Sequence, residues 1–135
     1  MEPGDPLSIL HDSLRGAPII WKGDYPYFIH PISDGIPRMD ASVLRAARDL
    51  IVSMVDWSKI DLIVSVEAMG LPLLAAVGEA TGKPTVVIRK RSYGMRGEVK
   101  VEVSTGYSKS TTYINDISPG ERVLIVDDVI STGGT

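Results

Sequence analysis

The chain has 135 residues, 44% of them hydrophobic and 23% charged, which is the balance of one globular domain with a real core. It contains no cysteine, so disulfides, thiolate catalysis and zinc–thiolate sites are excluded. The net charge of -3 lacks the basic excess of a nucleic-acid binder, and neither a signal-peptide pattern nor a membrane-spanning run is present. We therefore expect a cytoplasmic protein that binds neither nucleic acid nor membrane.

The N-terminal segment predicts a small cover over the main sheet. Leucines at helical spacing indicate a short helix that ends at Gly16, and residues 17–21 resemble a short strand. Residues 24–37 carry aromatic side chains and three prolines, a composition that favours an ordered irregular cover over a long element.

The middle of the chain predicts a βαβ unit. Asp40 is a plausible N-cap for a helix whose apolar residues recur at helical spacing to about residue 55. Residues 61–66 form a nearly continuous apolar run, which indicates a central strand covered on both faces. A helix that Pro72 opens follows, and then a second buried strand over 83–89, so a right-handed crossover is expected.

The last third predicts a hairpin and another strand of the sheet. Val99, Val101 and Val103 alternate with polar residues, and 111–114 can pair with them as a hairpin with one wet face. Residues 122–126 are a third buried strand. The chain therefore predicts an α/β fold with a doubly wound, mainly parallel sheet and a small cover.

The strongest chemical signal follows this third strand, where Asp127 and Asp128 lead into a loop of Ser, Thr and Gly. Open α/β folds place their ligand crevice at the carboxyl ends of parallel strands, and such a loop presents N–H groups and hydroxyls to a phosphate. Adjacent carboxylates suit vicinal sugar hydroxyls or hydrated Mg²⁺. Neither the Walker pattern nor the dinucleotide fingerprint occurs. A phosphorylated sugar fits both halves of the motif.

This string resembles the signature with which type I phosphoribosyltransferases bind phosphoribosyl pyrophosphate (PRPP). Nearly the whole chain is similar to archaeal hypoxanthine/guanine phosphoribosyltransferases, through the segments 22–31, 34–37, 67–72, 88–94 and 105–109. The resemblance implies the type I phosphoribosyltransferase fold as a single domain over 1–135. It also implies a hood within 1–38 and a core over 39–135, with a flexible β-hairpin flap at 92–112. Relatives continue beyond the last residue with a helix and further strands, so the domain is expected to be incomplete at its C-terminus.

The implied reaction belongs to purine salvage. It moves the 5-phosphoribosyl group from PRPP to hypoxanthine or guanine, gives IMP or GMP and pyrophosphate, and needs Mg²⁺; the implied assembly is a homodimer. Two alternatives stay open: an adenine phosphoribosyltransferase, and a non-enzymatic PRPP-sensing regulator, against which the lack of a basic DNA-binding segment argues. The flap is expected to open and close, and to exclude water from the reaction.

The same resemblance implies the residues that bind PRPP. The implied set is Asp127, Asp128, Ser131, Thr132, Gly133, Gly134 and Thr135. We call the two aspartates the acid pair; they are the implied catalytic residues and the implied Mg²⁺ ligands, through water. Asp127 is the implied ribose partner and Asp128 the implied aid to proton removal from the base, although the two can exchange roles.

Pyrophosphate and base contacts are implied elsewhere in the chain. Glu67, Ala68, Met69 and Gly70 form the implied pyrophosphate loop. Cations are needed because the leaving pyrophosphate gains charge; the candidates are Arg89, Lys90 and Arg91, with Arg89 the first choice, and Lys109, Ser108 and Tyr107 in the flap. Candidates to stack on a purine are Tyr27 and Phe28, and the alternative for either ring is packing of the hood on the sheet. His11 and His30 have no visible partners and are expected to be structural or exposed.

Overall fold

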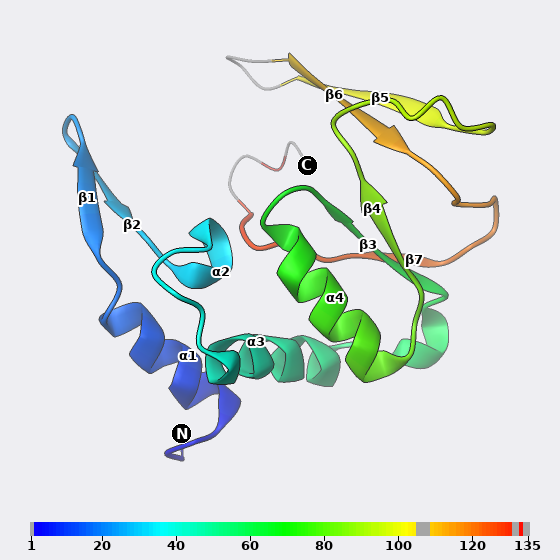
Figure 1. The fold of residues 1–135 in the computed structure, drawn as a ribbon. Helices are drawn as coiled ribbons and strands as arrows, with labels where there is room; N and C mark the ends of the chain where they lie inside the picture. The colour runs from blue at the N-terminus through cyan, green and yellow to red at the C-terminus, as the bar shows by residue number, and fades with distance from the viewer. Residues whose placement is uncertain (1, 105–108, 131–132, 134–135) are drawn as a thin grey trace.

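The structure is a computed structural model that describes residues 2–104, 109–130 and 133. The described strands form a three-stranded sheet and a pair of two-stranded hairpins (Figure 1). One hairpin belongs to the N-terminal segment and the other follows the central βαβ unit. This arrangement agrees with a parallel core flanked by two smaller covers.

The central sheet is parallel and has the strand order β4-β3-β7. β3 (Leu62–Val66) lies between β4 (Thr85–Ile88) and β7 (Val123–Ile125). Val64 is paired with Val86 on one side and with Ile125 on the other. The prediction of a central parallel strand is confirmed, and the carboxyl ends of all three strands lie at one edge.

The prediction that the second and third strands are buried is wrong. β3 is buried over four of its five residues, whereas β4 and β7 are only partly covered and Ile125 is 61% exposed. In the described part of the chain these two strands are the edges of the sheet, with one neighbouring strand each. Apolar composition does not distinguish an edge strand from a central one.

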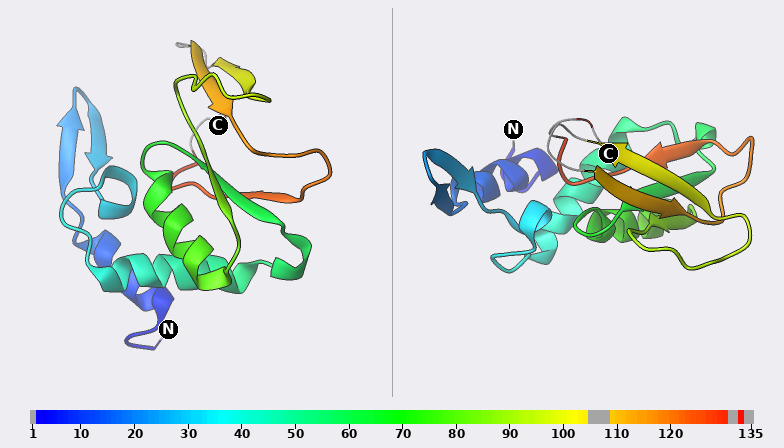
Figure 2. Two further views of the ribbon diagram at one scale, coloured as in Figure 1. Left: turned by 45° about the vertical axis from the view of Figure 1, so that its right-hand side comes forward. Right: turned by 90° about the horizontal axis from the view of Figure 1, so that it is seen from above.

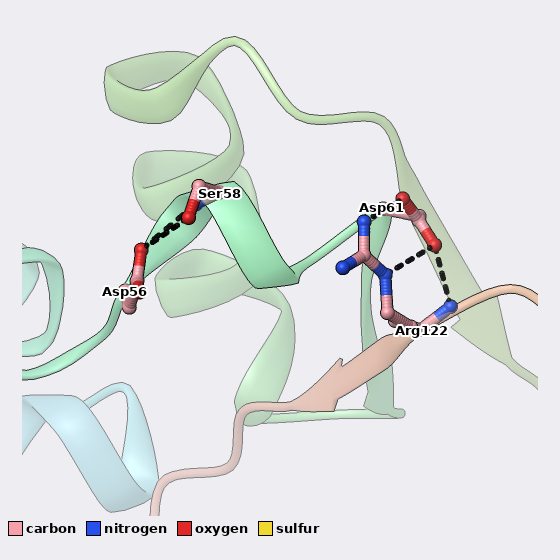
Figure 3. A network of polar contacts seen from close by, with 4 residues as sticks. All are labelled: Asp56, Ser58, Asp61 and Arg122. Carbon is pink, nitrogen blue, oxygen red and sulfur yellow. Dashed lines mark hydrogen bonds and ion pairs between the residues drawn. The ribbon is translucent and has the colours of Figure 1, made fainter.

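Asp61 and Arg122 fix the relative position of β3 and β7 where both strands begin. The backbone amide of Arg122 donates to Asp61 Oδ2 at 2.7 Å, and its Nη2 lies 3.1 Å from Oδ1 (Figure 3). Hydrogen bonds from the Arg122 side chain are the largest cause that lowers the pKa of Asp61. This pair sets the register at the amino ends and therefore places the residues that follow both strands side by side.

Two helices build the core against the sheet, α3 (Ala41–Met54) and α4 (Gly70–Thr81). The buried cluster comprises Ala47, Ile63, Leu73, Leu74, Val77 and Val126. Gly78 lets α4 lie close to the sheet, since a Cβ there would lie 2.5 Å from Cγ2 of Thr85. The predicted helix after Asp40 is confirmed, although Asp40 makes no side-chain capping bond.

The cover predicted for 24–37 is less irregular than expected, because it contains two short elements, while the expectation that it has no long element is confirmed. After α1 (Pro6–Arg15), β1 (Ile19–Lys22) and β2 (Tyr25–Phe28) form an antiparallel hairpin, and α2 (Pro31–Asp34) follows. The prolines are tolerated because one lies in a two-stranded ribbon and another opens a helix. Figure 2 shows this hairpin standing away from the central sheet.

The hairpin predicted for the flap is confirmed. It consists of β5 (Val99–Ser104) and β6 (Lys109–Ile114), and the residues that connect them lie outside the described ranges. A backbone bridge between Arg89 and Tyr113 joins β6 to the end of β4. η1 (Trp57–Lys59) completes the elements. Among the described residues, every helix is too short or too polar to cross a membrane.

Candidate functional site

A cavity of about 910 Å³ opens at the carboxyl edge of the central sheet, and we call it the crevice. The residues that follow the central strands line it, namely Glu67, Ala68, Lys90, Asp127 and Asp128. Val101, Thr112 and other residues of the β5–β6 hairpin line it from the other side. The crevice therefore runs from the ends of the parallel strands to the flap, and Ile51, Met54 and Val55 at the end of α3 line it as well.

The acid pair stands directly after β7. Asp127 Oδ1 accepts a hydrogen bond from the backbone amide of Asp128 at 2.8 Å. Burial, followed by the hydrogen bond and charge of Asp127 and the charge of Asp34, raises the pKa of Asp128 to about 6. A carboxyl with such a pKa is better suited to exchange a proton near neutral pH than an ordinary aspartate is.

Residues 67–70, for which the resemblance implies contacts to pyrophosphate, connect β3 to α4. Glu67 Oε1 accepts the backbone amide of Lys90 at 2.6 Å, and this bond is the largest cause that lowers the pKa of Glu67. Met69 points to the hood, where a Cβ at Gly35 would lie 3.3 Å from its Cε. The side chains of Glu67 and Met69 are thus engaged by the protein, which leaves main-chain groups as the loop's contacts for an anion.

The basic cluster of Arg89, Lys90 and Arg91 follows β4. In the described residues, Lys90 is the member of the cluster that lines the crevice. Arg89 and Arg91 both lie over the ring of Tyr93, with Cζ 5.3 Å and 4.6 Å from its centroid. Arg91 Nη2 also donates to the Tyr93 hydroxyl at 3.0 Å. The first choice among these cations, Arg89, is therefore held beside the crevice rather than in its lining.

The flap and loop candidates are only partly described. Lys109 begins β6, and Gly133 lines the crevice with φ at +82°, a conformation that favours glycine. The candidates outside the described ranges are Tyr107, Ser108, Ser131, Thr132, Gly134 and Thr135.

Tyr27 and Phe28 occupy neighbouring positions of β2, so their rings lie on opposite faces of the hairpin. Tyr27 is 42% exposed and Phe28 is 53% exposed, so neither ring is packed as a core residue against the sheet. Lys22 Nζ lies 4.8 Å from the centre of the Tyr27 ring. Only one of the two faces can therefore be turned toward a given base.

Glu98 and Asp34 are not among the site residues that the sequence implies, although Asp34 begins one of the segments that carry the resemblance. Glu98 joins the start of the flap to the residue that follows β6, because it accepts from the backbone amide of Tyr93 at 2.9 Å and from Asn115 Nδ2 at 3.0 Å. Asp34 of α2 is close enough to the acid pair for its charge to raise the pKa of Asp128. A periodicity argument cannot find such pairs, because their members are far apart in sequence.

His30 is buried and has partners, which corrects the expectation that none exist. Its Nδ1 accepts the backbone amide of Ile32 at 3.2 Å, and its Nε2 lies 2.9 Å from Ser13 Oγ. Burial is the largest cause that lowers the pKa of His30, and Asp34 acts in the opposite direction. A neutral His30 therefore joins α1 to α2 within the hood, a structural role. His11 is exposed.

The acid pair suits Mg²⁺ better than a metal that needs a full set of protein ligands. Among the described residues there is no group of three or more His, Cys, Asp or Glu side chains that could hold a metal ion. Mg²⁺ is usually bound by one or two carboxylates together with water and substrate phosphates. Two adjacent carboxylates in a crevice fit that donor set.

The fold and the crevice define a class, an α/β protein that presents carboxylates and cations at the ligand edge of a parallel sheet, as a phosphorylated sugar requires. Residues 35–135 match the family model described as the phosphoribosyl transferase domain. The chain belongs to this family.

Curated relatives are about half identical to the chain. The hypoxanthine/guanine phosphoribosyltransferase of Aciduliprofundum boonei is 54% identical over 129 residues, which are 96% of this chain and 70% of the relative. The protein of the same name from Ferroglobus placidus is 53% identical over 129 residues, 96% of this chain and 68% of the relative. The similarity therefore extends through the hood as well as the core.

Solved structures share the fold. The adenine phosphoribosyltransferase of Thermoanaerobacter pseudethanolicus superimposes with a TM-score of 0.76 at 24% identity, over 93% of this chain and 73% of that one. The Saccharomyces cerevisiae enzyme, solved with adenine and an imino-altritol bisphosphate, has a TM-score of 0.76 at 22% identity, over 95% and 76%. At such identities the likeness concerns the fold alone, and it confirms the type I phosphoribosyltransferase fold.

Proposed function

We propose that the chain transfers the 5-phosphoribosyl group of PRPP to hypoxanthine or guanine and releases pyrophosphate, with IMP or GMP as product. The observation that carries this proposal is the 54% identity, over 96% of the chain, to a relative that bears the name of this activity. The crevice supports it, because the acid pair and the basic residue Lys90 line the same cavity.

The chain's own residues have distinct tasks in this reaction. Asp127 accepts hydrogen bonds from the ribose hydroxyls, while Lys90 and the main chain of the pyrophosphate loop bind the leaving group. Asp128 accepts a proton from the purine ring as its nitrogen attacks the ribose, for which a pKa of about 6 is well placed. The flap covers the crevice and excludes water, which would compete with the base. Mg²⁺, when bound, would neutralise pyrophosphate charge beside the acid pair.

A competition assay tests the choice of base. Purified protein is given PRPP, Mg²⁺ and equal concentrations of hypoxanthine, guanine and adenine, and the nucleotides are separated by chromatography. IMP and GMP are expected to form well before AMP. Predominant AMP would favour an adenine phosphoribosyltransferase, the activity named for the solved structures that share the fold.

A single-turnover measurement separates enzyme from regulator. A PRPP-sensing regulator would bind PRPP with Mg²⁺ and form no nucleotide at any base concentration. The proposed homodimer is a further part of this proposal, and light scattering of the purified protein tests it.

A further inference from the structure

A buried hydroxyl beneath the acid pair has no role in what has been described so far. Ser65 is the fourth residue of β3, its exposed fraction is 0%, and no hydrogen-bond partner for its Oγ lies in the described part of the chain. The three preceding strand residues are apolar. A buried polar atom without a hydrogen bond is unfavourable, and an alanine at this position would avoid that cost. The Ser65 hydroxyl is therefore expected to gain a hydrogen-bond partner when a ligand binds.

The surroundings of Ser65 indicate that partner. A Cβ added to Gly70 would overlap Ser65 Oγ and would lie 3.1 Å from Asp127 Oδ1. The hydroxyl and the carboxylate therefore border the same small space, which is open only because residue 70 has no side chain. β3 and β7 are neighbours in the sheet, so this geometry follows from the strand order.

We propose that Ser65 is a positioning residue for PRPP: when PRPP and Mg²⁺ bind, its hydroxyl donates to the Asp127 carboxylate, directly or through one water. This inference rests on the proposed function, because it assumes that Asp127 receives the ribose hydroxyls. This bond would orient the Asp127 carboxylate from the side of β3. The backbone amide of Asp128 already donates to Asp127 Oδ1 at 2.8 Å. Gly70 has the matching task of keeping the space between them open.

The first test is Ser65→Ala in the 135-residue chain. Calorimetry with PRPP and Mg²⁺, without base, is expected to show about tenfold weaker PRPP binding, because a hydrogen bond to a charged group is lost. The melting temperature without ligand is expected to be unchanged or higher, since an unbonded buried hydroxyl is removed. The KM for the base is expected to stay the same.

Two further variants sharpen the result. Ser65→Cys keeps the size but donates weakly, so its PRPP affinity is expected between those of the wild type and Ser65→Ala. Ser53→Ala is the matched control, because it removes an exposed serine hydroxyl that donates to the Leu50 carbonyl at 2.7 Å and that does not line the crevice. This control is expected to bind PRPP like the wild type.

The outcomes separate this inference from the proposed function. If the wild type binds PRPP and Ser65→Ala binds it equally well, the positioning role is overturned while the proposed function stands. If Ser65→Ala loses melting temperature together with affinity for both substrates, Ser65 acts only on the fold and the inference is again overturned. A wild type that binds PRPP but makes no nucleotide contradicts the proposed function and leaves the calorimetric comparison valid. A wild type that does not bind PRPP overturns both.

Discussion

Glu67 and Arg89 form an ion pair across the edge of the sheet, with Nε 3.4 Å from Oε2. The same carboxylate accepts the backbone amide of Lys90 through Oε1 at 2.6 Å. Glu67 therefore holds the end of β4 and the start of the basic cluster against the pyrophosphate loop. The resemblance implies that Glu67 contacts pyrophosphate. Its position also lets it orient Lys90, the member of the basic cluster that lines the crevice.

Glu67→Ala is expected to weaken pyrophosphate binding about three- to tenfold, because both contacts to the end of β4 are lost. Glu67→Gln keeps an acceptor for the Lys90 amide and loses only the ion pair, so a smaller effect is expected. Product inhibition by pyrophosphate measures both. Glu79→Gln, on the exposed side of α4, is the control. Equal inhibition constants for all four proteins would contradict the anchoring role.

Asp127→Asn combined with Asp128→Asn is expected to abolish PRPP binding and turnover, since both negative charges that face ribose and metal are lost. The far-ultraviolet circular dichroism spectrum is expected to stay that of the wild type. Calorimetry with PRPP and Mg²⁺ and a nucleotide assay measure the two effects. Unchanged affinity and rate in a folded variant would disprove the central assignment of the acid pair.

The pH dependence of stability should report Asp128. Because its pKa is raised from 3.8 to about 6, the folded protein keeps a proton that the unfolded chain has already released. Asp128 therefore lowers the free energy of unfolding progressively as the pH rises from 3.8 to about 6. The difference in melting temperature between wild type and Asp128→Asn is expected to change with pH there and to be constant above it.

Asp34→Asn is expected to move the titration of Asp128 to lower pH, because one of the negative charges that raise its pKa is removed. The rate of nucleotide formation, which needs ionised Asp128, is expected to rise with pH through a midpoint near 6 in the wild type and a lower one in the variant. A pH–rate profile measures both. Identical midpoints would show that Asp34 does not act on the acid pair.

Phe28→Leu and Tyr27→Leu should differ, because the two rings lie on opposite faces of the hairpin. Phe28 is the candidate that the resemblance to archaeal hypoxanthine/guanine phosphoribosyltransferases favours, so Phe28→Leu is expected to raise the KM for the base about three- to tenfold through loss of stacking. Tyr27→Leu is expected to leave it unchanged, and the KM for PRPP is the internal control in both. Equal increases in the two variants would speak against stacking on one face.

The flap is expected to become protected on closure. Amide hydrogen exchange in 92–104 and 109–112 is compared between the free protein and a complex with PRPP analogue, Mg²⁺ and base. Slower exchange is expected in the complex, because the hairpin closes over the crevice. The amides of α1, which contributes no residue to the lining of the crevice, serve as reference. Equal exchange rates in both states would leave no support for a closing flap.

Local patterns in the sequence were enough to predict the strands of the central sheet, the helices α3 and α4, and the position of the acid pair. Continuous apolar runs marked the strands of the parallel sheet, alternation marked the β5–β6 hairpin, and the motif after β7 marked the crevice. The same reasoning missed the two short elements within 24–37, where the prolines suggested irregular structure but occur at positions that a hairpin and a helix tolerate. It also treated β4 and β7 as buried, because apolar runs do not reveal how many neighbours a strand has.

The sequence by itself determined which residues follow each strand, because the spacing of apolar, glycine and proline residues predicts the order of the elements. Only the tertiary structure decided which of those residues meet. Glu67 reaches Lys90 across 23 residues, and the space beside Gly70 is shared by Ser65 and Asp127 from two different strands. Such contacts depend on strand order and on the distance between backbones. A pattern along the chain predicts neither the strand order nor the distance between backbones, because pairing across a sheet joins residues that are remote in sequence.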